Sequence, residues 1–371
     1  MSWSSNVMVL TVVLQRQDTN LLHRSIPSSK SDHRNIAMLS GLLAVVAIAY
    51  CIVSHYLRKN PQPWMRCPSN RSSHQISDAS PSQLRAMRCK HISHRGGAGE
   101  QLENTMDAFD YAASLGTDMF ELDCHITNDG YVVIAHDNNL LRTCGKDILI
   151  SDTNYSDLPP LLPNQRLDFN HDYEFRARQD ADRKIILLED LFIRHPEMPM
   201  NIDIKRHDSI LISKTLSLIQ KYKRERITVW GNGGDKLNRF IASHDPDYTI
   251  GRLFSLRDIL VVLFSYHIGL LPFISLHAEY FEIPMCSMFI EQRKTFPARA
   301  GSPVLRFVLR VMDYMLTNQG LLDHLRARGV VTYFFVLNYE HEWQRAMEVG
   351  ATGIMTDFPA KLKTWLKHNQ F

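Results

Sequence analysis

From Lys90 onward, short β-rich runs alternate with segments of helical periodicity over about 280 residues. The expected strands are 91–94, 118–123, 131–136, 198–205, 227–230, 249–254, 280–285, 331–337 and 353–357. Helices are expected between most of them, at 209–223, 235–243, 303–327, 340–349 and 359–368. This order favours an α/β domain with a parallel sheet, which is either closed as a TIM (β/α)8 barrel or opened as a doubly wound sheet.

A helix is also expected after the first strand. Asn104 is its predicted N-cap, because an asparagine side chain can accept a hydrogen bond from the first helical turn. Met106, Phe109 and Ala113 follow at the spacing of one buried face. Gly116 is the predicted end of the helix, since glycine readily adopts the left-handed conformation found there.

The stretch from Asn35 to Leu57 contains no formally charged residue. At about 1.5 Å per residue, its 23 positions span roughly 34 Å as a helix, which is enough to cross a bilayer core. A signal peptide fits less well, because the run begins 35 residues into the chain and exceeds the usual length of the apolar region in such a peptide. A buried core helix is disfavoured by the lack of a polar face. Basic residues on both flanks leave the orientation of a membrane helix open.

These patterns predict four parts of the chain. Residues 1–35 form an N-terminal tail, 36–57 a transmembrane anchor, 58–89 a linker rich in proline and serine, and 90–371 the barrel. The expected architecture is therefore a barrel preceded by an N-terminal transmembrane helix, in a single-pass membrane protein.

A second uncharged stretch lies at 259–278, between Asp258 and Glu279. It is long enough to span a membrane, but a crossing at this point would divide the barrel in two. We interpret it as an apolar insertion that dips into a membrane or faces lipid with one side. A buried barrel helix and a true membrane span are the alternatives.

The composition narrows the class of protein. With 42 basic and 39 acidic residues the net charge is only +3, which gives no support for nucleic-acid binding through a basic surface. A hydrophobic content of 44% and a charged content of 22% are typical of a chain that folds around a core. The mean hydropathy of -0.21 argues against a protein with many membrane spans.

Acidic residues stand at two of the predicted strands. Glu121 and Asp123 alternate in 118–123, so both carboxylates project from one face near the strand end, which is the catalytic face of a barrel. The strand 198–205 likewise places Asp203 and Lys205 on one face. Hard oxygen ligands suit Mg²⁺ or Ca²⁺, and the lysine suits a phosphate group. A solvated acidic pair on an edge strand is the simpler reading of the first strand alone.

Two histidines follow predicted strands. His94 is succeeded by Arg95 and two glycines, a turn that can place a guanidinium and backbone close to a phosphate. His136 ends the strand at 131–136. Histidines on one face can supply a general acid and a general base, or one of them can ligate a metal. A structural role is the alternative for each histidine taken singly.

These residues lie in motifs that resemble those of glycerophosphodiester phosphodiesterase domains. The matching segments are HISHRGGAGEQLENTMDAF, GTDMFELDCHITNDGYVVIAHDNNLLRT, MNIDIK and VGATGIMTDFP, in this order. The resemblance covers about residues 90 to 365. TVWGN (228–232), FEIPM (281–285), the N-terminal anchor and the apolar insertion are similar to the membrane-associated lysophospholipase D branch.

The resemblance implies a TIM barrel, one divalent cation, Mg²⁺ or Ca²⁺, and a role for each matching residue. The catalytic histidines are His94 and His136. The metal ligands are Glu121, Asp123 and Asp203, with His136 as a further member of the metal shell. The phosphate-binding residues are Arg95 and Lys205, and the supporting residues are Glu103 and Asn104.

The sequence departs from the family pattern in two places. Asp203 stands where many members have glutamate, which shortens this ligand by one methylene. The segment FFVLN (334–338) replaces a common WTVN strand, so Phe334 and Phe335 stand in for a tryptophan at the mouth of the site.

The implied function is a membrane-bound, metal-dependent phosphodiesterase of the lysophospholipase D type. Its expected substrates are lysophosphatidylcholine, lysophosphatidylethanolamine and N-acyl forms, and its products are lysophosphatidic acid and the head-group alcohol. The alternatives are an enzyme acting on soluble glycerophosphodiesters, a non-catalytic membrane-tethered barrel and a phosphoinositide phospholipase C. The expected partners are this substrate and the lipid bilayer, without nucleic acid. The expected location is the endoplasmic reticulum or another intracellular membrane, with the plasma membrane as the alternative.

Overall fold

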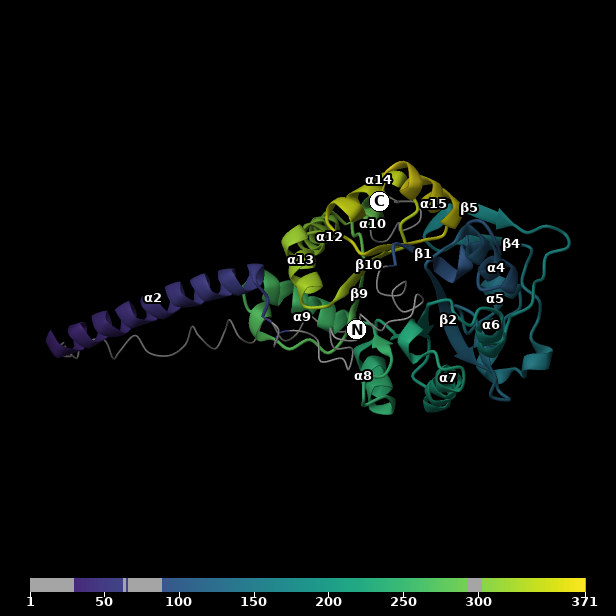
Figure 1. The fold of residues 1–371 in the computed structure, drawn as a ribbon, viewed down its shortest axis with the longest axis horizontal. Helices are drawn as coiled ribbons and strands as arrows, with labels where there is room; N and C mark the ends of the chain where they lie inside the picture. The colour runs from purple at the N-terminus through teal and green to yellow at the C-terminus, as the bar shows by residue number, and fades with distance from the viewer. Residues whose placement is uncertain (1–29, 63–64, 66–88, 292–301, 371) are drawn as a thin grey trace, which may run out of the picture. The chain divides into compact units, whose positions relative to one another are not determined.

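The computed structural model describes residues 30–62, 65, 89–291 and 302–370 (Figure 1). The chain divides into two compact units, Met1–Val53 and Ser54–Phe371. The expected N-terminal tail, 1–35, lies outside the described residues up to residue 29. The expected linker, 58–89, lies outside them at 63–64 and 66–88.

The described part of the first unit belongs to the helix α2 (Lys30–Lys59), whose last six residues, from Ser54 onward, are part of the second unit. Within α2, the segment Met38–Lys59 contains an 18-residue window with a mean hydropathy of 2.0. Among the described helices it is the one that is long and apolar enough to cross a membrane. Arg58 and Lys59 stand in the last turn, where positive side chains stabilise the carboxyl end of a helix.

The second unit is the predicted TIM barrel. In the described residues, eight parallel strands follow one another around it in the order β8, β7, β6, β2, β1, β11, β10 and β9. The barrel strands are β1 (His91–Ser93), β2 (Met119–Ile126), β6 (Met200–Ile204), β7 (Thr228–Gly231), β8 (Gly251–Arg252), β9 (Tyr280–Pro284), β10 (Val331–Phe335) and β11 (Gly353–Thr356). A parallel bridge between Leu253 and Tyr280 joins the two ends of this order, so the sheet is nearly closed and the doubly wound alternative is excluded.

Helices cover the outside of the barrel and connect successive strands (Figure 1). They are α4 (Met106–Leu115), α6 (Leu188–Arg194), α7 (Ser209–Lys221), α8 (Asp235–His244), α9 (Leu256–His267), α10 (Met288–Glu291), α12 (Pro303–Leu316), α13 (Gln319–Ala327), α14 (Glu340–Glu348) and α15 (Pro359–His368). Buried side chains fill the space between helices and strands, and a smaller cluster around Ile92, Tyr280 and Tyr333 fills the barrel itself. The barrel is thus a packed scaffold for the carboxyl ends of its strands.

The structure corrects the predicted start of α4. Thr105, not Asn104, is the N-cap, and its side chain accepts a hydrogen bond from the Ala108 backbone. Asn104 instead has a positive φ of 58° and points its side chain toward the barrel. Gly116 ends the helix in the left-handed conformation, as expected.

Several elements differ from the expected alternation of strand and helix. The strand β3 (Val132–Ile134) pairs antiparallel with β2, so it is a hairpin arm and not a barrel strand. The predicted helix 303–327 is two helices, because Asn318 caps α13 and starts it anew. The long β2–β6 connection also contains a short helix, α5 (Leu141–Cys144), and a second hairpin, β4 (Asn164–Leu167) with β5 (Asn170–Arg176).

The uncharged stretch 259–278 forms most of α9 and the 3-10 turn η7 (Leu271–Phe273), between β8 and β9. One side of α9 is buried in the barrel core, including Val262 and Leu263. The other side is exposed, including Phe264. With 12 residues, α9 is about 18 Å long, too short to span a bilayer core. The stretch is therefore amphipathic, and the alternative of a true membrane span is excluded.

Candidate active site

A cavity of about 420 Å³ opens at the carboxyl ends of the barrel strands. Seven of the nine predicted site residues line it: His94, Arg95, Glu121, Asp123, His136, Asp203 and Lys205. The other two, Glu103 and Asn104, are buried behind the lining and bind it through hydrogen bonds. The barrel thus brings together side chains that are more than 100 positions apart in the sequence.

The acidic residues meet because β2 and β6 are neighbours in parallel register. Asp123 pairs with Asp203 across these strands, so their side chains leave the sheet on the same face. The Nζ atom of Lys205 lies 2.7 Å from Oδ1 of Asp123 and 2.6 Å from Oδ2 of Asp203. The lysine therefore bridges the two carboxylates.

Glu121 and Asp123 have opposite ionisation tendencies. Burial and the nearby charge of Asp123 raise the pKa of Glu121 well above its ordinary value. Burial alone would also raise the pKa of Asp123, but the charges of Lys205 and Arg95 hold it well below its ordinary value. The site thus carries one strongly ionised carboxylate beside one that favours its proton.

The turn after β1 holds Arg95 in a conformation that residues with side chains rarely adopt. Its φ is 50°, and its backbone N–H donates to Oε2 of Glu121 at 2.9 Å. The backbone N–H of Asn104, which also has a positive φ, donates to the Arg95 carbonyl, and its side-chain amide donates to Asp123 at 3.0 Å. A Cβ atom on the next residue, Gly96, would lie 2.8 Å from Cβ of Ala108. The packing of α4 against this turn therefore requires glycine at that position.

The Arg95 guanidinium is surrounded by carboxylates. It lies 3.2 Å from Glu103, 3.4 Å from Asp123 and 2.8 Å from Asp168. Burial would lower the pKa of Arg95, but these carboxylates raise it well above its ordinary value. Arg142 extends the network, because it binds Glu103 at 2.7 Å. Arg95 is thus a fixed positive charge in the wall of the cavity.

Each predicted catalytic histidine has a carboxylate partner. The Nδ1 atom of His94 lies 2.6 Å from Oδ1 of Asp357, at the end of β11. The Nδ1 atom of His136 lies 2.7 Å from Oδ1 of Asp137. A carboxylate at Nδ1 keeps the proton on that nitrogen and leaves Nε2 to exchange protons with a substrate. The His136 carbonyl is also 3.1 Å from Nε2 of His125, a buried histidine whose pKa is lowered to about 4 by burial.

The donor set of the cavity suits a divalent cation. Its lining contains four carboxylates and two permanent positive charges, from Glu121, Asp123, Asp203, Glu282, Arg95 and Lys205. Full ionisation would leave two negative charges in excess, and carboxylate oxygens are preferred ligands of Mg²⁺ and Ca²⁺. No group of three or more His, Cys, Asp or Glu side chains in the described part of the chain is arranged to hold a metal ion. Lys205 lies between two of the predicted ligands instead.

The remaining wall of the cavity is apolar. Its side chains are Phe169, Leu253, Phe254, Leu256, Ile259, Pro284, Phe335, Val336 and Met355. Of the predicted aromatic pair, Phe335 reaches the cavity, whereas Phe334 points to the helix layer and is fully buried there. Adjacent side chains of a strand face opposite sides of the sheet, so both could not line one cavity.

Comparison with known proteins identifies the family and the fold. Residues 94–361 match the model of the glycerophosphoryl diester phosphodiesterase family. The chain belongs to this family. It is 44% identical to lysophospholipase D GDPD1 of Rattus norvegicus over 279 residues, which cover 75% of this chain and 86% of that protein. It is 32% identical to lysophospholipase D GDPD3 of Homo sapiens over 277 residues, which cover 75% of this chain and 85% of that protein.

This phosphodiesterase of the lysophospholipase D branch also resembles solved structures. A putative glycerophosphoryl diester phosphodiesterase from Silicibacter pomeroyi has a TM-score of 0.56 and 16% identity, with 78% of this chain and 98% of that chain covered. A phosphodiesterase from Oleispira antarctica, solved with the product sn-glycerol-3-phosphate, has a TM-score of 0.54 and 18% identity, with 75% and 96% covered. At these identities the similarity shows the TIM-barrel fold alone.

Four acidic residues at or beside the candidate site have no role in the sequence analysis: Asp137, Asp168, Glu282 and Asp357. Asp137 and Asp357 lie inside the family motifs, so their place beside a histidine or at a strand end was a usable signal. Glu282 lies in FEIPM and accepts a 2.6 Å hydrogen bond from Asn201. Asp168 lies in the turn of the β4–β5 hairpin, which no hydrophobic pattern indicated.

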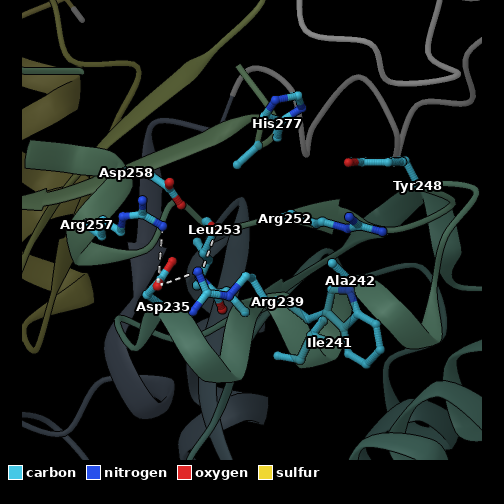
Figure 2. Close-up of a pocket in the computed structure, with 13 residues that line it drawn as sticks. Asp235, Arg239, Ile241, Ala242, Tyr248, Arg252, Leu253, Arg257, Asp258 and His277 are labelled. Carbon is cyan, nitrogen blue, oxygen red and sulfur yellow. Dashed lines mark hydrogen bonds and ion pairs between the residues drawn. The ribbon is translucent and has the colours of Figure 1, made fainter. Parts of the chain in front are cut away.

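A second cavity, of about 310 Å³, lies between α8, β8 and α9 (Figure 2). Asp235 binds Arg239 at 2.8 Å and is 3.7 Å from Arg257, so these charges neutralise one another (Figure 2). None of the predicted site residues lines this cavity. The predicted site residues thus gather at the first cavity and not at this one.

Proposed function

We propose that this phosphodiesterase is a membrane-bound, metal-dependent lysophospholipase D. It would hydrolyse lysophosphatidylcholine, lysophosphatidylethanolamine and N-acyl forms to lysophosphatidic acid and the head-group alcohol. The observation that carries this proposal is the composition of the cavity, in which two histidine–carboxylate pairs face an extended apolar wall. A lysophospholipid consists of a charged phosphodiester and an acyl chain. The charged side of the cavity matches the phosphodiester, and the apolar wall matches the acyl chain. The names of the relatives agree with this assignment.

The proposed reaction begins at the free glycerol hydroxyl next to the phosphodiester. One histidine accepts the proton of this hydroxyl, and the oxygen forms a bond to phosphorus. The bond from phosphorus to the head-group oxygen breaks, and the other histidine donates a proton to that oxygen. Water then opens the cyclic diester to give lysophosphatidic acid. His94 and His136 are the two histidines, and either can take either part.

The positive side chains of the cavity have a separate role in this proposal. Lys205 and Arg95 stabilise the extra negative charge that develops on the phosphate oxygens. Glu121, Asp123 and Asp203 would hold one divalent cation, Mg²⁺ or Ca²⁺. His136 would be a further ligand in place of its role in proton transfer, because its Nε2 atom cannot serve both at once. When bound, the cation supplies further positive charge to the phosphate. Glu103 and Asn104 support this group, because they hold Arg95 and Asp123 in place.

The division of the chain is part of the same proposal. Residues 36–57 anchor the protein in a membrane, 58–89 link the anchor to the barrel at 90–371, and 1–35 form a tail. The apolar length of Met38–Lys59 supports the anchor. The bilayer of the endoplasmic reticulum or another intracellular membrane is the proposed location, and the plasma membrane is the alternative.

A comparison of two substrates tests the proposed function. The full chain, reconstituted in lipid nanodiscs with Mg²⁺ or Ca²⁺, is given lysophosphatidylcholine or glycerophosphocholine at matched concentrations. We expect kcat/KM for lysophosphatidylcholine to be higher by about tenfold or more, because only this substrate fills the apolar wall. Preference for glycerophosphocholine would assign the enzyme to soluble glycerophosphodiesters instead.

A further inference from the structure

The helix α9 leaves large apolar side chains in contact with solvent on the side opposite the barrel core. Phe264 is 52% exposed, and Ile268, directly after the helix, is 61% exposed. Phe273, in the following turn η7, is 47% exposed. The segment 259–278 that contains them carries no formal charge.

The helix α12 adds a second exposed row to this side of the barrel. Val304, Phe307 and Val311 follow one another at helical spacing and are 73%, 67% and 39% exposed. The opposite side of α12 packs against the core. The end of α9 is joined to α12 where His267 Nε2 lies 3.4 Å from the Met315 carbonyl. Figure 1 shows α9, α12 and α13 on one side of the barrel, with α4, α5 and α6 on the other.

We call the exposed side chains Phe264, Ile268, Phe273, Val304, Phe307 and Val311 the apolar face. Large apolar side chains that stay exposed on two neighbouring helices indicate an interaction site more strongly than single scattered ones do. The charges around the face identify its partner. Arg306 and Arg310 are the basic residues of α12, and its acidic residue, Asp313, is buried and bound to Arg345. Apolar side chains flanked by arginines match the boundary between acyl chains and lipid phosphates.

The end of the apolar helix α2 is fixed beside the apolar face. Ser54 Oγ donates a 2.7 Å hydrogen bond to the Gly269 carbonyl, in the connection between α9 and η7. Arg58 Nη1 donates to the Tyr266 carbonyl at 3.4 Å, and the Arg58 carbonyl is 2.9 Å from Nδ1 of His324. Ser54 directly follows the apolar run that ends at Val53. These hydrogen bonds fix Ser54 and Arg58 against the connection that follows α9.

The same helix leads from the apolar face to the catalytic cavity. Leu256 and Ile259, in the first turn of α9, line the cavity that contains His94. The carboxyl end of α9 lies beside Ser54 and Arg58 through Gly269 and Tyr266. The helix is about 18 Å long, a distance that an extended acyl chain can cover.

We propose that the apolar face is a membrane-docking surface, which holds the mouth of the cavity against the bilayer so that lipid substrate enters along α9. Docking itself is independent of the substrate, whereas lipid entry rests on the proposed lysophospholipase D function. The partner is a lipid bilayer that contains phosphate head groups. A second copy of the chain would be the competing occupant of the same surface.

Fluorescence quenching tests docking without reference to activity. The full chain is reconstituted in nanodiscs of phosphatidylcholine with brominated acyl chains, and Phe307→Trp is compared with the control Ile193→Trp. Ile193 is 60% exposed on α6, away from α9 and α12 (Figure 1). The tryptophan at position 307 should add fluorescence of which about half or more is quenched by the bromines, whereas the control should add none that is quenched. Equal and weak quenching in both variants would overturn the proposal, as would a dimer that Phe307→Glu converts to monomer.

Activity tests the second half of the proposal. Phe264→Glu combined with Phe307→Glu should lower kcat/KM for lysophosphatidylcholine in the nanodisc by about tenfold and change that for soluble glycerophosphocholine by less than about twofold. Ile193→Glu combined with Ile210→Glu is the matched control and should change neither. Equal effects on both substrates would overturn lipid entry along α9. If the unchanged protein turns over no lysophospholipid, the proposed function fails, and the quenching result still decides docking.

Discussion

The Nδ1 atom of His94 lies 2.6 Å from the Oδ1 atom of Asp357, although the two residues are 263 positions apart. They meet because β1 and β11 are adjacent parallel strands, in which Ser93 pairs with Thr356. The other carboxylate oxygen of Asp357 accepts a 2.8 Å hydrogen bond from Asn338. Asp357 is thus held on both sides and orients the His94 ring toward the cavity.

Asp357→Asn should therefore lower kcat by about tenfold to a thousandfold, because a neutral amide no longer stabilises the charged His94 ring or fixes its tautomer. KM should change much less, since Asp357 does not line the cavity. Steady-state kinetics and the melting temperature of the same preparation measure both effects. A large fall in the melting temperature with unchanged kcat in the folded fraction would assign Asp357 a structural role.

His94→Ala and His136→Ala should each abolish measurable turnover of lysophosphatidylcholine in a protein that remains folded. A phosphodiester with a p-nitrophenyl leaving group separates the general acid from the general base, because p-nitrophenolate leaves without being protonated. The variant that lacks the general acid should recover activity with this substrate, and the variant that lacks the general base should not. Substantial activity of either variant on lysophosphatidylcholine would contradict the two-histidine scheme.

Much of the fold could be predicted from local patterns. The alternation of strand and helix indicated the barrel. Charged residues at alternate positions of two strands indicated the candidate site, because strand ends of a barrel converge. Local patterns do not predict which turn residues reach the site or which residues far apart in the sequence pair with each other. Asp168 reaches Arg95 only through the β4–β5 hairpin, whose sequence has no distinct hydrophobic period.

The partners of the site residues depend on barrel closure. Glu282 reaches Asn201 across the barrel interior, and no sequence spacing records that contact. The sequence also does not distinguish the antiparallel β3 from the barrel strands, because a hairpin arm and a buried parallel strand have similar short apolar runs. At the start of α4, either Asn104 or Thr105 has a side chain that can cap, and the hydrogen bond of Asn104 to Asp123 decides between them.

Glu282 gives the metal-free protein a pH-dependent stability. Burial and the charge of Asp203 raise its pKa to about 7, although the Asn201 hydrogen bond lowers it. The folded state then binds a proton more tightly than the unfolded state, so stability is lost as pH rises from about 4.5 to about 7. Relative to Glu282→Gln, the free energy of unfolding of the wild type should fall by about 1 to 3 kcal/mol over this range, since the carboxylate is only partly buried. Urea unfolding in EDTA measures the difference, and parallel pH profiles of the two proteins would contradict it.

A divalent cation should stabilise the folded protein independently of turnover. At about 100 times its Kd, a cation that binds only the folded state adds about 2.7 kcal/mol to the free energy of unfolding. Thermal unfolding with and without Mg²⁺ or Ca²⁺ should show this gain in the wild type and not in Asp123→Asn. Asp180→Asn is the control, because Asp180 is exposed and remote from the cavity. An equal gain in Asp123→Asn would place the cation elsewhere.

Product analysis in ¹⁸O-labelled water tests the central claim most directly. Lysophosphatidylcholine is incubated with the full chain in nanodiscs, and the products are identified by mass spectrometry, with His94→Ala as the control. The account predicts choline without ¹⁸O and lysophosphatidic acid with ¹⁸O in its phosphate, both absent in the control, because water attacks phosphorus after the head group has left. Release of a fatty acid, or choline that carries the label, would contradict it.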